Sequence, residues 1–339
     1  MQVDLLFLSN KAMQAAGVTD MEAAIEDVKN AYLLNKSGDV INPGKCVLRW
    51  GETVEDENTL GRINAMPGYI GGKYDMAGIK WIGSGPQNYK KGLPRASVTV
   101  VLNDPDTKLP VGIVDGTEIS SMRTGASGGI AIDLLAKKQA EVMTICGAGA
   151  QGHTQLQAAL LVRPGLHTVY VYDIRRENAE RFAQINARKY PAVTFIVTDD
   201  VEEAVRQSDI IDCVTLAAEP IIKGGWLKKG ALVMNMADYE ADHDCVFRAD
   251  KVVVDFWENV KHRMISTVAL MWRDGLFRDE QLHGELGDIL AGAKAPRESE
   301  DEIIYFNAVG AGILDLAVAA RCYKKAKEDG IGISVPYWE

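Results

Sequence analysis

The sequence predicts an α/β protein made of two parts, each with its own kind of sheet. Strand-like segments separated by Gly-rich turns occupy much of the first 115 residues, a pattern typical of antiparallel hairpins. From residue 141 onward, short apolar strands alternate with helical stretches, which indicates a parallel sheet flanked by helices. A chain of 339 residues is long enough to form two domains.

The first part begins with an amphipathic helix over residues 20–36. Asp20 is a suitable N-cap, and apolar residues follow it at spacings of three and four. A long helix over residues 117–136 leads out of this part. Between the two helices, strands are expected at 45–50, 60–66, 75–82, 96–103 and 111–114.

The second part alternates strand and helix before it ends in a long helix over residues 310–329, which Gly330 terminates. We expect this last helix to return to the first part. One domain would then be discontinuous, with residues 1–120 and 310–339, and residues 121–309 would form the other. A cleft between two such domains is a natural binding site. The expected strands are 141–146, 168–173, 193–197, 210–215, 231–235 and 251–254.

The first strand of the second part runs into the turn Cys146-Gly-Ala-Gly-Ala-Gln-Gly152. In this spacing the first glycine permits a tight turn, the second lets the backbone approach a pyrophosphate, and the third lets the next helix pack on the strand. The helix N-terminus that follows favours phosphate. A Rossmann dinucleotide site is therefore predicted, with loop residues Gly147, Gly149, Ala150, Gln151 and Gly152.

The choice of dinucleotide depends on Asp173, which ends the second strand 26 residues after Gly147. A carboxylate there accepts hydrogen bonds from the adenosine ribose and repels a 2′-phosphate, so NAD is predicted. Arg175 and Arg176 follow directly and could hold that phosphate if Asp173 turned away, which leaves NADP possible. Thr215 is a further expected cofactor residue.

Composition excludes several classes of partner. A net charge of −10 argues against nucleic acid and anionic membranes. No apolar run approaches the ~18–20 residues that span a bilayer, and the N-terminus lacks the basic segment of a signal peptide.

Five scattered cysteines are typical of reduced thiols in a cytoplasmic protein. Residues 242–245, Asp-His-Asp-Cys, are interpreted as a loop, so no metal is expected.

Several motifs occur in a fixed order: Ala65-Met66-Pro67, Gly78–Trp81, Ser121–Gly125, Cys146–Gly152, Gly284–Gly292, and Val309-Gly310 followed by Asp315. Together they resemble the ornithine cyclodeaminase/μ-crystallin family over essentially the whole chain. The resemblance implies an N-terminal substrate-binding and dimerisation domain, a Rossmann domain and a C-terminal helix that returns to the first domain. It also implies a homodimer and hydride transfer between a nicotinamide and the α-carbon of an amino acid or imine.

In this family, cations of the substrate domain hold the substrate carboxylate, and Lys80 and Arg123 match two of them. The physical reason is general, because a bound carboxylate needs charge-assisted hydrogen bonds and arginine offers a bidentate fork. An unpaired ammonium in the apolar strand around Lys80 would be costly. The alternatives are a solvent-facing lysine and a surface ion pair of Arg123.

The chain departs from the family pattern at two positions of the substrate domain. A third cation is usually an arginine after a proline, whereas this chain has Lys45, with Arg49 as a substitute if the register differs. Asn64 stands where a cyclodeaminase carries a glutamate that handles the distal amine of its substrate. These differences weaken the case for ornithine cyclisation.

A third departure concerns the acid that moves protons. The family's Gly-Gly-Asp segment is replaced by residues 235–240, in which Asp238 is the nearest equivalent. Glu240 and Asp242 are neighbours that could take its role. Asp238 and Lys80 are therefore the expected catalytic residues.

We expect an NAD(P)-dependent amino-acid dehydrogenase or ketimine reductase of amino-acid metabolism. Lys45, Lys80 and Arg123 would hold the carboxylate and aim the α-carbon at the nicotinamide. Two alternatives stay open. One is ornithine cyclodeamination to proline and ammonia, and the other is a non-catalytic NAD(P)H-binding protein of the μ-crystallin type. The substrate side chain is not predicted.

Overall fold

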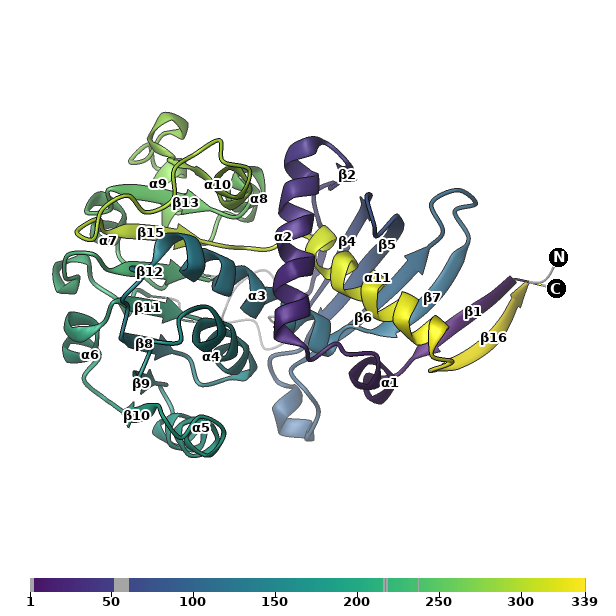
Figure 1. The fold of residues 1–339 in the computed structure, drawn as a ribbon, viewed down its shortest axis with the longest axis horizontal. Coiled ribbons are helices and arrows are strands. Elements are labelled where there is room, and N and C mark those ends of the chain that lie inside the picture. The colour runs from purple at the N-terminus through teal and green to yellow at the C-terminus, as the bar shows by residue number, and fades with distance from the viewer. Residues whose placement is uncertain (1–2, 52–60, 216, 218, 237, 339) are drawn as a thin grey trace. The chain divides into compact units, whose positions relative to one another are not determined.

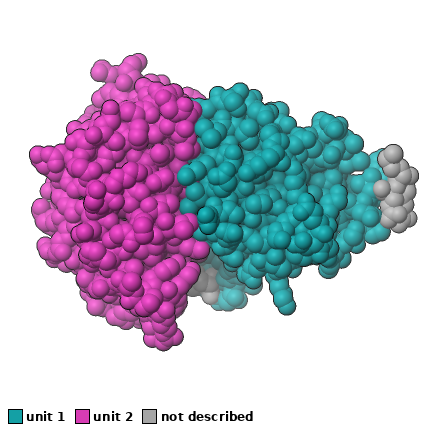
Figure 2. Space-filling view, in the orientation of Figure 1, with its two compact units in different colours: residues 1–123, 311–339 teal, residues 124–310 magenta. Residues whose placement is uncertain are grey.

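The computed structural model describes residues 3–51, 61–215, 217, 219–236 and 238–338. The chain forms two compact units, which Figure 2 distinguishes by colour. Unit 1 contains residues 1–123 and 311–339, and unit 2 contains residues 124–310. Helix α3 (Thr117–Leu135) begins in unit 1 and continues into unit 2.

Unit 1 is built on a largely antiparallel sheet in the order β16-β1-β7-β6-β5-β4-β2, with β3 also paired to β4. The hairpins expected from the sequence are present, but β1 and β16 were not predicted. They pair with each other, and β1 joins β7 in parallel. The strands are β1 (Val3–Leu8), β2 (Val40–Ile41), β3 (Cys46–Arg49), β4 (Arg62–Ile70), β5 (Met76–Ser84), β6 (Ala96–Asn103), β7 (Pro110–Asp115) and β16 (Ile333–Trp338).

Helix α11 (Gly312–Glu328) crosses this sheet over β4 to β7 (Figure 1). The approach is close because both the sheet and the helix have a glycine at the contact. A Cβ at Gly78 would lie 2.9 Å from Leu316 Cδ2 of the helix, and one at Gly312 would lie 2.8 Å from the Met66 carbonyl oxygen of the sheet. The first turn of α11 is therefore fixed directly above β4 and β5. The other helical elements of unit 1 are α1 (Asn10–Ala15), α2 (Met21–Ser37) and η1 (Asn88–Lys91).

Unit 2 contains a parallel sheet in the order β10-β9-β8-β11-β12-β15-β13-β14. This sheet confirms the predicted α/β class. The prediction missed β15, which inserts between β12 and β13. The strands are β8 (Val142–Cys146), β9 (Thr168–Tyr172), β10 (Thr194–Val197), β11 (Ile210–Cys213), β12 (Leu232–Asn235), β13 (Lys251–Val254), β14 (Gly284–Glu285) and β15 (Ile304–Asn307).

Helices surround this sheet, and α3 packs against α4 so closely that a Cβ at Gly125 would lie 2.6 Å from the Thr154 carbonyl oxygen. The helical elements that follow α3 are α4 (Ala150–Val162), α5 (Arg176–Lys189), α6 (Val201–Gln207), η2 (Gly224–Trp226), α7 (His243–Phe247), α8 (Trp257–Arg263), α9 (Thr267–Arg273), η3 (Asp279–Gln281) and α10 (Leu286–Leu290).

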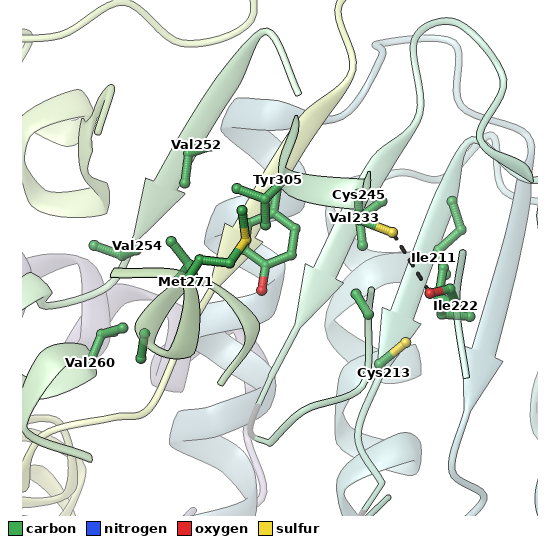
Figure 3. Close-up of a cluster of buried hydrophobic side chains, with 14 of the residues drawn as sticks. Ile211, Cys213, Ile222, Val233, Cys245, Val252, Val254, Val260, Met271 and Tyr305 are labelled. Carbon is green, nitrogen blue, oxygen red and sulfur yellow. Dashed lines mark hydrogen bonds between the residues drawn. The ribbon is translucent and has the colours of Figure 1, made fainter. Parts of the chain in front are cut away.

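One buried hydrophobic cluster of unit 2 joins the sheet to the helices that follow β10 (Figure 3). Strand residues such as Val233 and Tyr305 pack there with Met271 of α9. The Cys245 thiol donates to the Ile222 carbonyl oxygen at 3.8 Å. Cys213 is fully buried in this cluster, as a core residue should be. Among the described helices, none combines the length and apolarity needed to cross a membrane.

Candidate functional site

Lys80 is buried in the middle of the unit 1 sheet. Its side chain is 1% exposed, on strand β5 beneath α11. The ammonium donates to Asp315 Oδ1 at 2.7 Å and to Ser120 Oγ at 2.9 Å. A solvent-facing lysine is thereby ruled out, and the cost of burying the ammonium is offset by a buried carboxylate and a hydroxyl.

The same carboxylate oxygen also serves Arg123. The Arg123 Nε lies 3.3 Å from Asp315 Oδ1, and Arg123 is 13% exposed whereas Asp315 is fully buried. Asp315 Oδ2 has no hydrogen-bond partner among the described residues. One negative charge thus faces two positive charges, so the cluster keeps a net positive charge that suits an anionic ligand.

Burial lowers the pKa of the Lys80 ammonium from 10.5 to about 8. The charge of Asp315 and its hydrogen bond oppose this shift, and the nearby charge of Arg123 adds to it. Lys80 is therefore charged at neutral pH but close to titration. Perturbed groups of this kind are common at functional sites.

The strand register places Lys45 and Arg49 at different distances from Lys80. Met66 pairs with Lys80, and Cys46 pairs with Ala65, so Lys45 continues the row that contains Met66 and Lys80. Directly opposed residues of antiparallel strands share a face. Arg49 lies four residues further along, roughly 13 Å away at the rise of a strand. The geometry therefore favours Lys45.

In unit 2 the glycine loop has the geometry expected of a phosphate-binding turn. Gly147 has φ +110°, a conformation that disfavours other residues. A Cβ at Gly152 would lie 2.4 Å from the Gly147 carbonyl oxygen, so helix α4 packs tightly on the loop. Gly149 is the N-cap of α4 and makes no side-chain cap, and a Cβ there would meet nothing within 4 Å. The N–H groups around Ala150 and Gln151 thus lie at an open helix N-terminus.

Asp173 is fixed at the carboxyl end of β9, close to this loop. Its Oδ2 accepts from the Ala148 N–H at 3.0 Å, and its Oδ1 accepts from the Arg175 N–H at 2.9 Å. Arg176 forms ion pairs with Glu180 and Asp199. The loop and the carboxylate are therefore held together, and Arg176 is engaged by its own acidic neighbours.

The three acidic candidates after β12 have different environments. Glu240 is fully buried and accepts from the N–H and hydroxyl of Thr215, which ties down the predicted cofactor residue Thr215. Asp242 caps α7 through the Cys245 N–H at 3.1 Å. Asp238 is partly exposed and pairs with Arg263 at 2.9 Å. Only Asp238 of these three combines exposure with freedom from a structural role.

Sequence reasoning missed the part that Asp315 plays. It was noted as a family match, but no role was given to it. The available signal was a single carboxylate in an otherwise apolar helical stretch, residues 313–320. An isolated acid in such a stretch must find a buried cation. Within the described residues, no cluster of three or more potential metal ligands occurs.

The sequence profile of the ornithine cyclodeaminase/mu-crystallin family matches residues 8–330. The chain is 35% identical to the N-((2S)-2-amino-2-carboxyethyl)-L-glutamate dehydrogenase of Staphylococcus aureus, with 99% of both chains covered. Its fold matches the Thermococcus litoralis Delta(1)-pyrroline-2-carboxylate reductase in complex with NADH and L-proline, with a TM-score of 0.89, 34% identity, and 98% and 100% of the two chains covered.

A second solved structure is an archaeal alanine dehydrogenase dimer with bound NAD, which has a TM-score of 0.90 and 30% identity over 99% of this chain and 100% of that one. These relatives confirm the predicted enzyme class, an NAD(P)-dependent oxidoreductase of amino acids or imines. The profile match covers far more than half of the sequence, and the relatives align along nearly its full length. The chain therefore belongs to the ornithine cyclodeaminase/mu-crystallin family.

Proposed function

We propose that this protein catalyses reversible hydride transfer between NAD(H) and the α-carbon of an amino acid or its imine. The observation that carries the proposal is the cluster of Lys80, Arg123 and Asp315, in which two cations share one buried carboxylate. Two kinds of relative, an alanine dehydrogenase and a Delta(1)-pyrroline-2-carboxylate reductase, support the same reaction class.

Unit 1 binds the substrate in this proposal. Lys45, Lys80 and Arg123 hold its carboxylate, and the fork of Arg123 fixes the orientation of the α-carbon. Asp315 acts on the substrate only indirectly, because it keeps the ammonium of Lys80 and the guanidinium of Arg123 in place. A carboxylate held in this way presents the α-carbon in one defined orientation.

Unit 2 binds NAD(H), which supplies or accepts the hydride when it is bound. The open N-terminus of α4 fits a pyrophosphate, and Gly149 leaves room for it. Asp173 fits the adenosine ribose. Its Oδ1 accepts from the Arg175 N–H and the Asn178 amide, whereas its Oδ2 accepts from the Ala148 N–H and keeps a lone pair for a ribose hydroxyl. Its charge favours NAD over NADP.

Asp238 moves the proton. The electron-poor iminium that forms at the α-carbon needs a nearby carboxylate, both to stabilise it and to exchange protons with the nitrogen or a water. Arg263 pairs with the Asp238 carboxylate at 2.9 Å and fixes its position. Glu240 and Asp242 are committed to structural hydrogen bonds and do not serve this purpose.

The test combines substrates with two variants. Wild-type protein is incubated with NAD(H) and a panel of amino acids, or of 2-oxo acids with amines, and absorbance at 340 nm is followed. A net change in absorbance supports the proposal. Formation of proline and ammonia from ornithine without a net change in absorbance would instead assign a cyclodeaminase.

Asp238→Ala should lower kcat by roughly 10²–10⁴-fold. Asp242→Ala should keep kcat and lose about 1 kcal/mol of stability, and equal losses of kcat would contradict the assignment of Asp238.

We also propose a homodimer in the cytoplasm, with unit 1 as the dimerisation domain. The archaeal relative is a dimer, and the face of the sheet opposite α11 exposes apolar side chains, including Trp81 at 42%. A hollow on that face is lined by Pro67, Tyr69 and Ile79. Light scattering should give a dimer for wild type and a monomer for Trp81→Glu. The cytoplasmic location rests on the free cysteines.

A further inference from the structure

Two arginines stand directly opposite each other on neighbouring strands of unit 1. Arg49 of β3 pairs with Arg62 of β4. Cβ atoms of such a pair lie about 4.5–5.5 Å apart, and like charges in this position destabilise a sheet. Neither arginine forms an ion pair with any residue that the structure describes. The arrangement is costly unless an anion lies between the two guanidinium groups.

The arginine pair lies on the same face of the sheet as the proposed carboxylate site. Side chains alternate along a strand, so Arg62, Asn64 and Met66 point to one face. Met66 pairs with Lys80, and the register from Arg62 to Ile70 runs without a shift. The row of paired residues that contains Arg62 and the row that contains Met66 and Lys80 are roughly 13 Å apart along the strand. Two long side chains and a small substrate can bridge this distance.

This end of the sheet lies beyond the start of α11. The helix begins at Gly312, which contacts the Met66 backbone, so the Arg62 row lies on the far side of its N-terminus. The N-cap of α11, Ala311, makes no side-chain cap, so the positive end of the helix dipole adds to the charge of the arginines. The local field therefore favours negative charge.

Asn64 lies between the Arg62 row and the Met66 row, and its amide oxygen is unused. Its Oδ1 is buried without a hydrogen-bond partner in the described part of the chain. An asparagine amide can be turned to present either its oxygen or its NH₂ group. Turned the other way, the side chain would donate to an oxyanion placed between Lys80 and Arg62. A neutral amide here does not attract a distal amine, as a carboxylate would.

We propose that Arg49 and Arg62, together with Asn64, bind a second anionic group on the side chain of the substrate. The protein then acts on amino or imino acids with a distal carboxylate or phosphate rather than on apolar ones. This inference rests on the proposed function, because it assumes that Lys80 and Arg123 hold the α-carboxylate. Arginine suits the role because its fork binds an oxyanion in a bidentate manner.

The test measures a preference rather than an absolute rate. Rates of NAD reduction are compared for L-glutamate, O-phospho-L-serine, L-glutamine and L-alanine. Wild type should have kcat/KM values for an anionic substrate roughly 10- to 100-fold above that for L-glutamine, as charge-assisted hydrogen bonds provide. Arg49→Gln/Arg62→Gln should bring this ratio close to one. The preferred substrate distinguishes a distal carboxylate from a phosphate.

The matched control removes two positive charges at the other end of α11. Lys324 and Lys327 are exposed there, and Lys324→Gln/Lys327→Gln should keep the wild-type ratio. Residues 52–57, which connect the strands, include four carboxylates of the chain itself. If these neutralise the arginines, the double arginine variant loses thermal stability and its substrate ratio does not change, which overturns the proposal.

Failure of the proposed function has a different signature. If wild type oxidises no amino acid of the panel and reduces none of the 2-oxo acids supplied with amines, hydride transfer is wrong, and the subsite is tested by calorimetry with glutarate and butyrate. Tighter binding of glutarate by wild type, weakened roughly tenfold in Arg49→Gln/Arg62→Gln, supports the subsite independently. Equal binding of glutarate and butyrate by wild type refutes it.

Discussion

At the scale of single residues, Lys80 carries the strongest physical constraint in unit 1, because an ammonium that is 1% exposed depends on its few neighbours. Its dependence on Asp315 links two positions 235 residues apart in the sequence. The neighbouring Arg123 brings a second positive charge to the same oxygen. The charge state of Lys80 is consequently set by packing, and it can be followed through the pH dependence of kcat/KM.

Substrate affinity should depend on pH through Lys80. The pKa of Lys80 is lowered by burial to about 8, so the free protein loses this positive charge as pH rises through 8. We expect kcat/KM for a carboxylate substrate to fall above about pH 8 while kcat changes less, because binding weakens first. Lys80→Arg should move the fall to higher pH, since a guanidinium keeps its charge. An unchanged alkaline limit in Lys80→Arg would contradict this assignment.

Asp315→Asn should shift the pH profile of kcat/KM to lower pH, opposite to the shift expected for Lys80→Arg. The negative charge of Asp315 raises the pKa of Lys80, so its removal lowers that pKa further and moves the alkaline fall to lower pH. KM should rise, because Lys80 and Arg123 repel each other without the shared carboxylate. Asp27→Asn is the matched control, since Asp27 is another buried carboxylate of unit 1, paired with Arg321. It should cost stability and leave the profile in place.

The role of Asp173 is tested by cofactor affinity. Asp173→Ala should raise KM for NAD(H) by roughly tenfold, because the ribose loses a charged acceptor. The same variant should also narrow the difference in KM between NAD and NADP. Asp199→Ala removes an exposed carboxylate that pairs with Arg176 and should leave KM for NAD(H) unchanged. A KM for NAD(H) that does not respond to Asp173→Ala would disprove the assignment to the ribose.

At the scale of elements, different glycines of the glycine loop are needed for cofactor binding and for folding. Gly149 has room for a methyl group and an ordinary φ of −89°, so Gly149→Ala should fold normally. The added methyl should weaken NAD binding by roughly tenfold or more, because the backbone can no longer approach the phosphates. Gly152→Ala should instead lower Tm, since its Cβ would lie 2.4 Å from the Gly147 oxygen. Calorimetric titration with NAD and thermal unfolding check both results.

Some elements of this fold could be predicted from the sequence and others could not. The glycine loop and Asp173 were predictable because short stretches of chain determine their geometry. Strand β15 (Ile304–Asn307) was missed because its mostly apolar sequence gives no sign of where it inserts, and insertion between β12 and β13 is a long-range property. The shared carboxylate of Asp315 was missed for the same reason. Propensity and spacing describe neighbours in sequence, whereas packing chooses partners across the fold.

At the scale of the whole molecule, two buried carboxylates differ in whether they have partners. In unit 1, Asp315 forms ion pairs with Lys80 and Arg123 through one of its oxygens. In unit 2, Asp212 of β11 is fully buried, and neither of its oxygens has a hydrogen-bond partner among the described residues. It lies in the centre of the parallel sheet between Ile145 and Met234. No partner offsets the cost of ionising it, so this group should make stability depend on pH.

Asp212→Asn should stabilise the protein increasingly as pH rises. Burial, and then the charge of Glu240, raise the pKa of Asp212 well above its usual range. The native state therefore keeps a proton that the unfolded chain releases above about pH 4, and the free energy of unfolding falls by up to about 1.4 kcal/mol per pH unit until the native pKa is reached. An asparagine has a similar shape and no such proton, so the variant should lack this fall.

Urea unfolding at a series of pH values from 2 to 9 measures the difference between wild type and Asp212→Asn. Asp209, which directly precedes the same strand β11, provides a control of opposite sign. Burial opposes the ionisation of Asp209, but hydrogen bonds from Lys228 and from the N–H groups of Glu141 and Val142 outweigh it and lower the pKa. Asp209→Asn should lose stability at neutral pH and approach wild type as pH falls through the lowered pKa. Parallel stability curves for wild type and Asp212→Asn would mean that Asp212 finds a partner in solution, and the cost assigned to its burial would then be wrong.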